Sequence, residues 1–352
     1  MSASTSVDWL TIFERVGTHV VGTLKTALLH PGSSFSLASL LTALLIALLF
    51  LGYKHRNRKR PVPLRVLLRA IFPRRIIASR TLKADVGFFL FNTFIITSML
   101  GWALLSSHVV SGAVTGGLTG LFGALSPSSL PMWACVAILT VAAFVAYEFG
   151  FFLAHYLLHK VKFLWEFHTV HHQAEALSPL TNYRLHPVDS VMFVNFTGIA
   201  MGAASGTLVY LFGQPVEPFT LWSVNAIVVL FTYLLDHLHH TEFWIPLTGF
   251  WGKIIVSPAH HQIHHSLNPI HYDKNMGSCL AIFDWMFGTL FMPGKETEKL
   301  KFGVAPGAAD PHSISECLVN PFIRAAAHAG LKAPDTAGAQ DVTPIDPTPK
   351  AS

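Results

Sequence analysis

Long apolar stretches constrain the fold of this chain more than any other feature. A helix needs about 20 mostly apolar residues to cross the hydrocarbon core of a bilayer. Only 12% of the 352 residues are charged, which is about half the usual share of a soluble domain. We therefore predict an all-α, multi-pass transmembrane helical bundle. The apolar stretches are residues 35–53, 86–106, 132–154, 191–212 and 219–235, of which the last two alternatively form a hairpin that does not fully cross.

Basic residues predict the orientation of this bundle. Residues 54–83 contain eleven of the 24 Lys and Arg residues, whereas residues 107–130 contain none. By the positive-inside rule the first segment is a cytoplasmic loop and the second is a loop on the opposite side. Counting spans from there places the histidine-rich segments 155–186 and 237–271 together on the cytoplasmic side. Apolar spans flank the basic loop, so we expect it to attract anionic headgroups and not nucleic acid.

The two ends of the chain differ from its middle. Residues 1–34 mix charged and apolar positions, which predicts an amphipathic interfacial segment and no cleavable signal. Residues 301–352 predict a tail with one short helix within residues 311–328 and disorder over the last twenty residues. The three cysteines lie far apart and form no CxxC motif, so neither a disulfide framework nor a thiolate metal site is expected.

Histidine is the unusual residue of this sequence. The chain has twenty, and fourteen of them fall between His155 and His271. HYLLH places two histidines four apart on one helix face, and WEFHTVHH and PAHHQIHH each repeat an HxxHH spacing. Histidines at the headgroups would explain the abundance but not the repeated spacing. The predicted metal ligands are His155, His159, His168, His171, His172, His186, His237, His240, His261, His264 and His265.

The type of donor atom narrows the choice of metal ion. Eight or more imidazoles exceed the four ligands of one tetrahedral zinc ion. Two ions with open positions for O₂ fit better, and imidazole suits iron. HExxH is absent, which argues against a zinc protease of that type. Glu148 lies seven residues before His155 on the same helical stripe, so we expect its carboxylate to orient a ligating imidazole.

With the sequence DKNMGSCLAIFDWMFGTLF that follows them, the three histidine boxes closely resemble the fatty acid hydroxylase / sterol desaturase superfamily over about residues 140–300. The resemblance implies ligation by the eight histidines of the HxxxH and HxxHH boxes, with His240 as a further family histidine. It also implies supporting roles for Asn275 and Asp284 in the N-x-G and D-x-x-F-G-T signature, where Gly277 and Gly288 permit tight turns.

The sequence also departs from the family pattern. Tyr156 follows the first histidine, where the family often has Arg. Asp236 and His240 stand where the fatty acid 2-hydroxylase branch has HxxxH. Either Asp236 replaces a ligand or His237 supplies it, and the sequence leaves both open.

The resemblance implies a membrane-bound, non-haem di-iron oxygenase that hydroxylates or desaturates a lipid C–H bond with O₂. No cytochrome b5-like domain is fused to this chain, so we expect a separate ferredoxin- or cytochrome b5-type donor with its reductase. The competing predictions are a metal-binding membrane protein and a catalytically inactive scaffold of the same family. We expect a bacterial inner membrane location and four regions, which are residues 1–34, 35–131, 132–300 (the catalytic domain) and 301–352.

Overall fold

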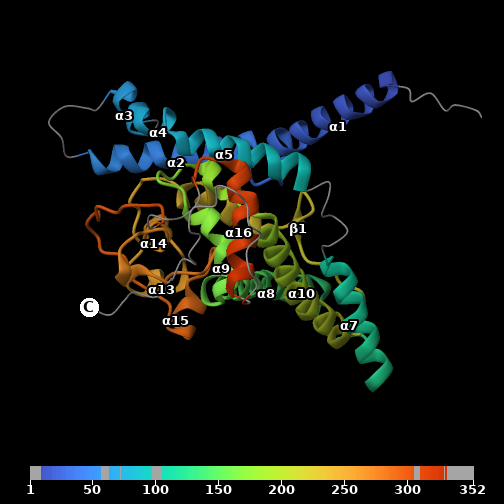
Figure 1. Ribbon diagram of the computed structural model, residues 1–352. Coiled ribbons are helices and arrows are strands. Elements are labelled where there is room, and N and C mark those ends of the chain that lie inside the picture. The colour runs from blue at the N-terminus through green and yellow to red at the C-terminus, as the bar shows by residue number, and fades with distance from the viewer. Residues whose placement is uncertain are drawn as a thin grey trace, which may run out of the picture.

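Figure 1 shows the computed structural model, which describes residues 9–56, 63–71, 73–96, 105–304, 310–328 and 330. Helices make up almost all of its regular structure, which confirms the all-α prediction. The named strands of the described residues are one short antiparallel pair, β1 (Thr220–Leu221) and β2 (Val224–Asn225). Their register pairs Thr220 with Asn225 and Leu221 with Val224.

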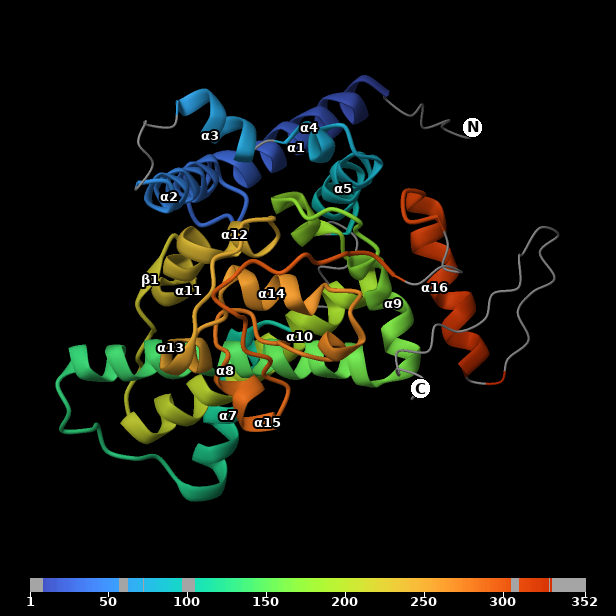
Figure 2. The ribbon, with the colours of Figure 1, turned by 90° about the vertical axis from the view of Figure 1, so that its left-hand side faces the viewer.

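Three of the described helices are long and apolar enough to cross a membrane. They are α2 (Leu37–Lys54), α8 (Met132–Lys160) and α10 (Pro187–Phe212). Ser36 caps α2 by accepting a hydrogen bond from the Ser39 N–H, and Pro187 begins α10 at a position where a helix does not need an N–H. The helices support an integral membrane protein. Figures 1 and 2 show that α2 and α8 run in crossed directions, and the predicted order of crossings stays a prediction.

Glycines allow α10 to pack closely against two neighbours. A Cβ atom at Gly150 of α8 would lie 2.5 Å from the Phe196 carbonyl oxygen of α10. A Cβ atom at Gly202 of α10 would lie 2.6 Å from the Ser107 carbonyl oxygen of α7. Small residues at such crossings let helix backbones approach, as in membrane bundles generally. The partner helix α7 spans Ser107–Phe122, so the prediction of a loop over residues 107–130 is wrong for this part.

One predicted span lies partly outside the described residues, and another differs from the structure. Within residues 86–106, α5 (Arg80–Phe91) continues as a π-helical turn, η1 (Asn92–Ile96), and residues 97–104 lie outside the described residues. Residues 219–235 begin with the β1–β2 pair, and the helical segment Ala226–His239 that follows is too short to qualify as a span. Here the hairpin turn at Trp222 and Ser223 delays the start of the helix, and hydropathy averaged over a window does not detect such a turn.

The N-terminal helices form one layer. In both views α1 (Trp9–Leu29), α2, α3 (Leu64–Ile71), α4 (Arg74–Ile77) and α5 lie together at the top, above the histidine-rich region. The predicted amphipathic segment is therefore a helix over most of its length, and residues 1–8 lie outside the described residues. Basic residues 63–83 contribute α3, α4 and the start of α5 to this layer.

The histidine-rich region consists of short helices between this layer and α8, as Figure 2 shows for α14. Its elements are α9 (Lys162–His172), η3 (Pro179–Tyr183), α11 (Ala226–Phe231), η4 (Thr232–Asp236), α12 (His237–His239), α13 (Gly249–Ile254), α14 (Pro258–His264), η5 (Pro269–His271) and α15 (Ile282–Phe287).

Two fully buried ion pairs hold this region in place. Arg184, just after η3, places its Nη1 3.0 Å from Asp85 Oδ1 on α5. The C-terminal helix α16 (Ile314–His328) falls within the segment predicted to be helical, and it packs on α9. Its Arg324 Nε lies 2.7 Å from Glu166 Oε2, and both side chains are at most 1% exposed. Residues 331–352, which include the twenty predicted to be disordered, lie outside the described residues.

Candidate metal centre

Four helices deliver the predicted ligands to one buried region. The last two turns of α8 present two histidines, α9 presents three, the residue that ends α12 presents one, and α14 with its C-cap presents three. None of these nine side chains is more than 8% exposed, although histidine is a polar residue. They are His155, His159, His168, His171, His172, His240, His261, His264 and His265.

Five of these histidines form the first group, which we call the five-histidine cluster. One nitrogen from each lies within 4.8 Å of the corresponding nitrogen of every other member. The Nε2 atoms of His155 and His168 are 3.0 Å apart. The members are His155, His159, His168, His172 and His264.

The other four, which we call the four-histidine cluster, are His171, His240, His261 and His265. The Nε2 atom of His261 lies 2.9 Å from that of His240 and 3.1 Å from that of His265. The Nε2 atoms of His240 and His171 are 3.3 Å apart. The two clusters adjoin, because the ring centroids of His172 and His265 are 4.6 Å apart.

The nitrogens of the five-histidine cluster fit a bound metal ion. His155 Nδ1 donates to the Met276 carbonyl oxygen at 2.7 Å, and His264 Nδ1 donates to the Lys274 carbonyl oxygen at 2.9 Å. A carbonyl only accepts, so Nδ1 carries the ring proton and Nε2 keeps its lone pair. Nε2 of His159, His172 and His264 is buried and, among the described residues, has no hydrogen-bond partner. Nitrogens bound at about 2.1 Å to one ion lie about 3 Å apart.

Burial keeps these imidazoles neutral. It lowers the pKa of His168 and of His264 to about 3. Burial and the neighbouring histidines hold the pKa of His171 and of His261 well below 6.5. A neutral imidazole has the free lone pair that ligation requires, so the clusters are ready for a metal ion at neutral pH.

Two carboxylates that the sequence analysis did not predict lie beside the five-histidine cluster. Asp189 Oδ2 is 3.6 Å from His168 Nδ1, and Asp273 Oδ1 is 3.5 Å from His159 Nδ1. Asp189 is fully buried in the first turn of α10. Both distances exceed a direct hydrogen bond, yet the carboxylates face the ring nitrogens that point away from the cluster. Such carboxylates orient ligating imidazoles. The sequence signal that could have identified them is their position in HPVDS and DKN, shortly after the second and third histidine boxes.

Glu148 and Asp284 act on one loop and not on a ring directly. Glu148 Oε2 accepts from the backbone N–H groups of Cys279 and Leu280 at 2.7 and 2.9 Å. Asp284 accepts from the N–H groups of Met276 and Gly277 at 2.7 and 2.8 Å. The loop that they hold includes the Met276 carbonyl that orients His155. Glu148 therefore contacts this loop, and the expected contact with an imidazole is not made in the structure.

Asn275 has a comparable structural position. Its Oδ1 accepts from the Phe291 N–H at 2.8 Å, and its Nδ2 donates to the His260 carbonyl oxygen at 3.0 Å. Its backbone φ is +57°, a left-handed conformation that Asn tolerates better than most residues. Gly277 is required by space, because a Cβ atom there would lie 2.3 Å from the Leu280 carbonyl oxygen.

Three predicted site residues are not brought into either cluster. His186 caps α10, where its Nδ1 accepts from the Val188 N–H and its Nε2 donates to the Leu318 carbonyl oxygen at 3.1 Å. Both of its ring nitrogens are therefore occupied. His237 Nε2 lies 3.0 Å from Ser39 Oγ on α2. Asp236 lies 3.4 Å from the Asn182 side-chain amide.

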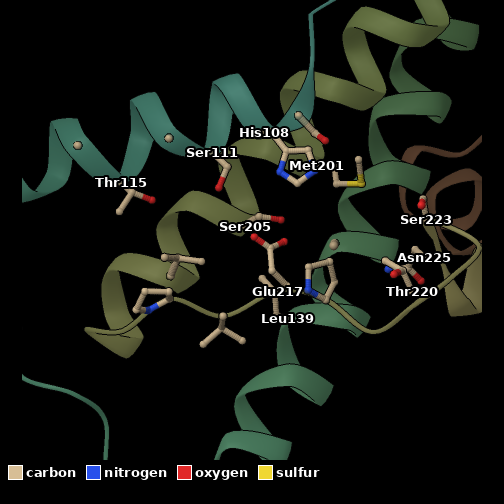
Figure 3. Close-up of a pocket in the computed structure, with 18 residues that line it drawn as sticks. His108, Ser111, Thr115, Leu139, Met201, Ser205, Glu217, Thr220, Ser223 and Asn225 are labelled. Carbon is tan, nitrogen blue, oxygen red and sulfur yellow. The ribbon is translucent and has the colours of Figure 1, made fainter.

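A separate hollow of about 440 Å³ lies between α7, α8 and α10 (Figure 3). His108 and Glu217 line it together with Ser111, Ser205 and other small polar residues. It belongs to neither histidine cluster, and within the described ranges it holds no group of three potential metal ligands. The candidate metal ligands of the described chain are therefore concentrated near the other end of α8.

Comparison with known proteins gives a consistent family. The fatty acid hydroxylase family model matches residues 140–289. Alkylglycerol monooxygenase of Homo sapiens is 31% identical over 163 residues, which are 46% of this chain and 32% of that protein. Ornithine lipid hydroxylase OlsE of Rhizobium tropici is 31% identical over 169 residues, 47% of this chain and 45% of OlsE.

A putative Δ7-sterol-C5(6)-desaturase of Arabidopsis thaliana is 24% identical over 216 residues, 60% of this chain and 68% of that protein. The chain spans about a third of the length of the alkylglycerol monooxygenases that it matches. No solved structure shows a significant match. The family match lies on the residues that build both histidine clusters, and through this region the chain is similar to the fatty acid hydroxylase family and to proteins named as lipid hydroxylases and a sterol desaturase.

Proposed function

We propose that this protein is a membrane-bound, non-haem di-iron oxygenase that hydroxylates a C–H bond of a lipid with O₂. One observation carries the proposal, which is the pair of adjoining, buried, all-histidine clusters. Nine imidazoles are more than one ion takes, and their division into five and four fits two ions. An all-imidazole donor set with open coordination positions suits iron.

The bound metal supplies the O₂ chemistry that no side chain provides, namely the oxidation of an unactivated C–H bond. The chain orients the imidazole rings and keeps bulk water away from the site. Asp189, Asp273 and the Met276 carbonyl face the outer ring nitrogens and fix the direction of the inner ones. Burial keeps the imidazoles neutral and excludes bulk water from the reacting atoms.

Hydroxylation is the reaction that we favour. Two of the relatives are named for adding oxygen, alkylglycerol monooxygenase and ornithine lipid hydroxylase, and both exceed 30% identity. Desaturation is the second candidate, because a relative of lower identity is named as a sterol desaturase. Both reactions begin at a C–H bond held near the metal, and the position of the carbon decides between them.

The remaining parts of the proposal concern the surroundings of the site. We assign residues 132–300 as the catalytic domain and place its histidine clusters on the cytoplasmic side of a bacterial inner membrane. The basic segment 54–83 supports this orientation. A separate ferredoxin- or cytochrome b5-type protein with its reductase supplies the electrons from that side.

Untargeted lipid mass spectrometry tests the function. Cells that express the chain together with an electron-donor system are compared with cells that express a His171→Ala, His264→Ala variant, which loses one ligand from each cluster. Lipids that gain one oxygen only with the intact chain support a hydroxylase. Lipids that lose two hydrogens only with the intact chain support the desaturase instead.

Metal analysis of the purified protein separates the competing functions. If the chain binds two iron ions but forms no lipid product in the presence of O₂ and reductant, the result supports a metal-binding protein. If the correctly inserted chain binds no metal, the result supports an inactive scaffold. Either result rejects the oxygenase proposal.

A further inference from the structure

An apolar groove of about 590 Å³ lies between α2, the α3–α4 segment and α12. Most of its lining is aliphatic or aromatic, with Leu40, Leu44 and Ala47 of α2 facing Ile71, Ile76 and Leu238. Because α2 is one of the candidate spans, lipid is the solvent expected around it. We call this space the apolar groove.

The apolar groove shares its walls with the metal site. His237 and Leu238 of α12 line it, and His240 of the four-histidine cluster follows two residues later. Leu177 lines it as well, five residues after His172 of the five-histidine cluster. The short segments that carry cluster histidines therefore also form part of the wall of the groove.

A second hollow, of about 600 Å³, adjoins the apolar groove, and Arg75 and Glu242 line both. These two side chains form an ion pair at the junction. The second hollow is lined by three bases and three acids, so we call it the charged hollow. The bases are Arg75, Lys299 and Lys301, and the acids are Glu175, Glu242 and Glu298.

This pairing of spaces has the shape and chemistry of one amphiphile. A hydrocarbon tail meets mostly apolar side chains in the groove, and its headgroup is left in the charged hollow. A purely anionic headgroup would meet three carboxylates there, and a purely cationic one would meet three bases. A headgroup with one ammonium and one anionic group pairs with both signs. Electrostatic complementarity of this kind selects among ligands more than it adds affinity.

We propose that the chain binds a zwitterionic membrane lipid, with its hydrocarbon tail in the apolar groove and its headgroup across the Arg75–Glu242 pair. The inference rests on the proposed function, since it names the substrate class of the same metal site. The tail then passes the α12 wall beside the four-histidine cluster. The headgroup fixes which carbon of the tail lies nearest to the metal.

Native mass spectrometry of the full-length, metal-loaded chain tests the inference without turnover. The delipidated protein is mixed in turn with dioleoyl phosphatidylethanolamine, dioleoyl phosphatidylglycerol and dioleoylglycerol, which share their chains and differ in the headgroup. We expect tight retention of the zwitterionic lipid alone. Leu44→Trp fills the groove and weakens that retention by about tenfold or more, because added volume in a packed space is not absorbed. The matched control is Leu45→Trp, since Leu45 is the next residue of α2, is 55% exposed and does not line the groove.

The headgroup is tested by Glu242→Gln. This change removes one acid from the charged hollow, so it shifts the preference from phosphatidylethanolamine toward phosphatidylglycerol. Equal binding of phosphatidylethanolamine by the Leu44→Trp and Leu45→Trp variants would overturn the assignment of the apolar groove as the binding site of the tail. Equal binding of all three lipids by the unaltered chain would overturn the zwitterionic preference.

Failure of this inference and failure of the proposed function give different results. If the chain oxidises a lipid in cells but Leu44→Trp changes neither binding nor product, the groove is not the substrate site and the oxygenase stands. If the zwitterionic lipid binds in the groove but no oxidised lipid forms, the binding site stands and the oxygenase is rejected.

Discussion

The two histidine clusters are similar in composition and differ in what surrounds them. Around the five-histidine cluster, two carboxylates and two backbone carbonyls face the outer nitrogens of the rings. In the four-histidine cluster, the outer Nδ1 atoms of His240 and His265 are buried and have no hydrogen-bond partner among the described residues. The described surroundings therefore offer the first cluster orienting groups that they do not offer to the outer nitrogens of His240 and His265 in the second. We expect the ion of the five-histidine cluster to be the more firmly bound.

The boxes also divide between the clusters in a regular way. His168 and His172 enter the five-histidine cluster, and His171 enters the other. His261 and His265 enter the four-histidine cluster, and His264 enters the other. In each HxxHH box the first and last histidines stay together, and the middle one crosses over. Successive residues of a helix point about 100° apart, so neighbouring histidines reach different clusters.

Removal of a ligand should have the largest effect on this comparison. We expect His264→Ala and His261→Ala each to reduce the oxidised lipid by at least about 100-fold, beyond the loss typical of an outer-shell change. His264→Ala should lose the ion of the five-histidine cluster, and His261→Ala should lose the ion of the four-histidine cluster alone. Metal analysis and lipid mass spectrometry measure both effects, with the exposed His108→Ala as control. Full metal content in either variant would contradict the assignment of ligands.

Loss of the α16 anchor should damage both clusters together, because α9 supplies ligands to both. Arg324→Met leaves the Glu166 carboxylate buried, with His328 as its remaining side-chain partner among the described residues. We expect a loss of about 3 kcal/mol in the free energy of unfolding, the lower end of the cost of breaking a buried pair. Adding Glu166→Gln should recover part of it. Unfolding of the purified chain in detergent measures the loss, and a drop of ion content in one cluster alone would contradict this role.

Asp189→Asn should affect one cluster and spare the other. The change keeps the shape of the side chain and removes the charge that faces His168 Nδ1, so metal affinity of the five-histidine cluster should fall about 10- to 100-fold. A chelator titration followed by metal analysis resolves the two ions. The matched control is Asp236→Asn, a carboxylate that lies next to Asn182 and outside both clusters. Equal metal loss in the two variants would show that Asp189 has no particular role in orientation.

Mild acid should have the smallest effect and should not distinguish the clusters. The folded chain keeps His168 and His264 neutral, with pKa values of about 3, whereas the unfolded chain protonates them below about 6.5. Since the unfolded state binds more protons, stability decreases as the pH falls from 6.5 toward 3. Between pH 7 and 6 each of these groups accounts for about 0.7 kcal/mol. Thermal unfolding of the metal-free chain at the two pH values measures the change, and higher stability at pH 6 would contradict it.

Much of the fold and of the site could be predicted before the structure. Hydropathy identifies α2, α8 and α10 because each is one uninterrupted apolar helix. It fails at residues 219–235, where a hairpin turn divides an apolar stretch, and at α7, which is too rich in glycine for its helix to be recognised. The carboxylates were the least predictable part. Glu148 shares a helical stripe with His155, yet its partners are backbone N–H groups that lie about 130 residues away.

The sequence by itself determined that this chain is helical and membrane-associated and that its histidines recur at the spacing of metal ligands, because helical periodicity and spacing are local properties. It also determined which histidines lie on neighbouring turns. Only the tertiary structure decided how the nine histidines divide between two clusters, that Asp189 and Asp273 lie beside one of them, and that His186 and His237 stand apart. Those outcomes depend on how α8, α9, α12 and α14 approach one another. The residue spacing within one segment does not predict how that segment packs against others far away in the sequence.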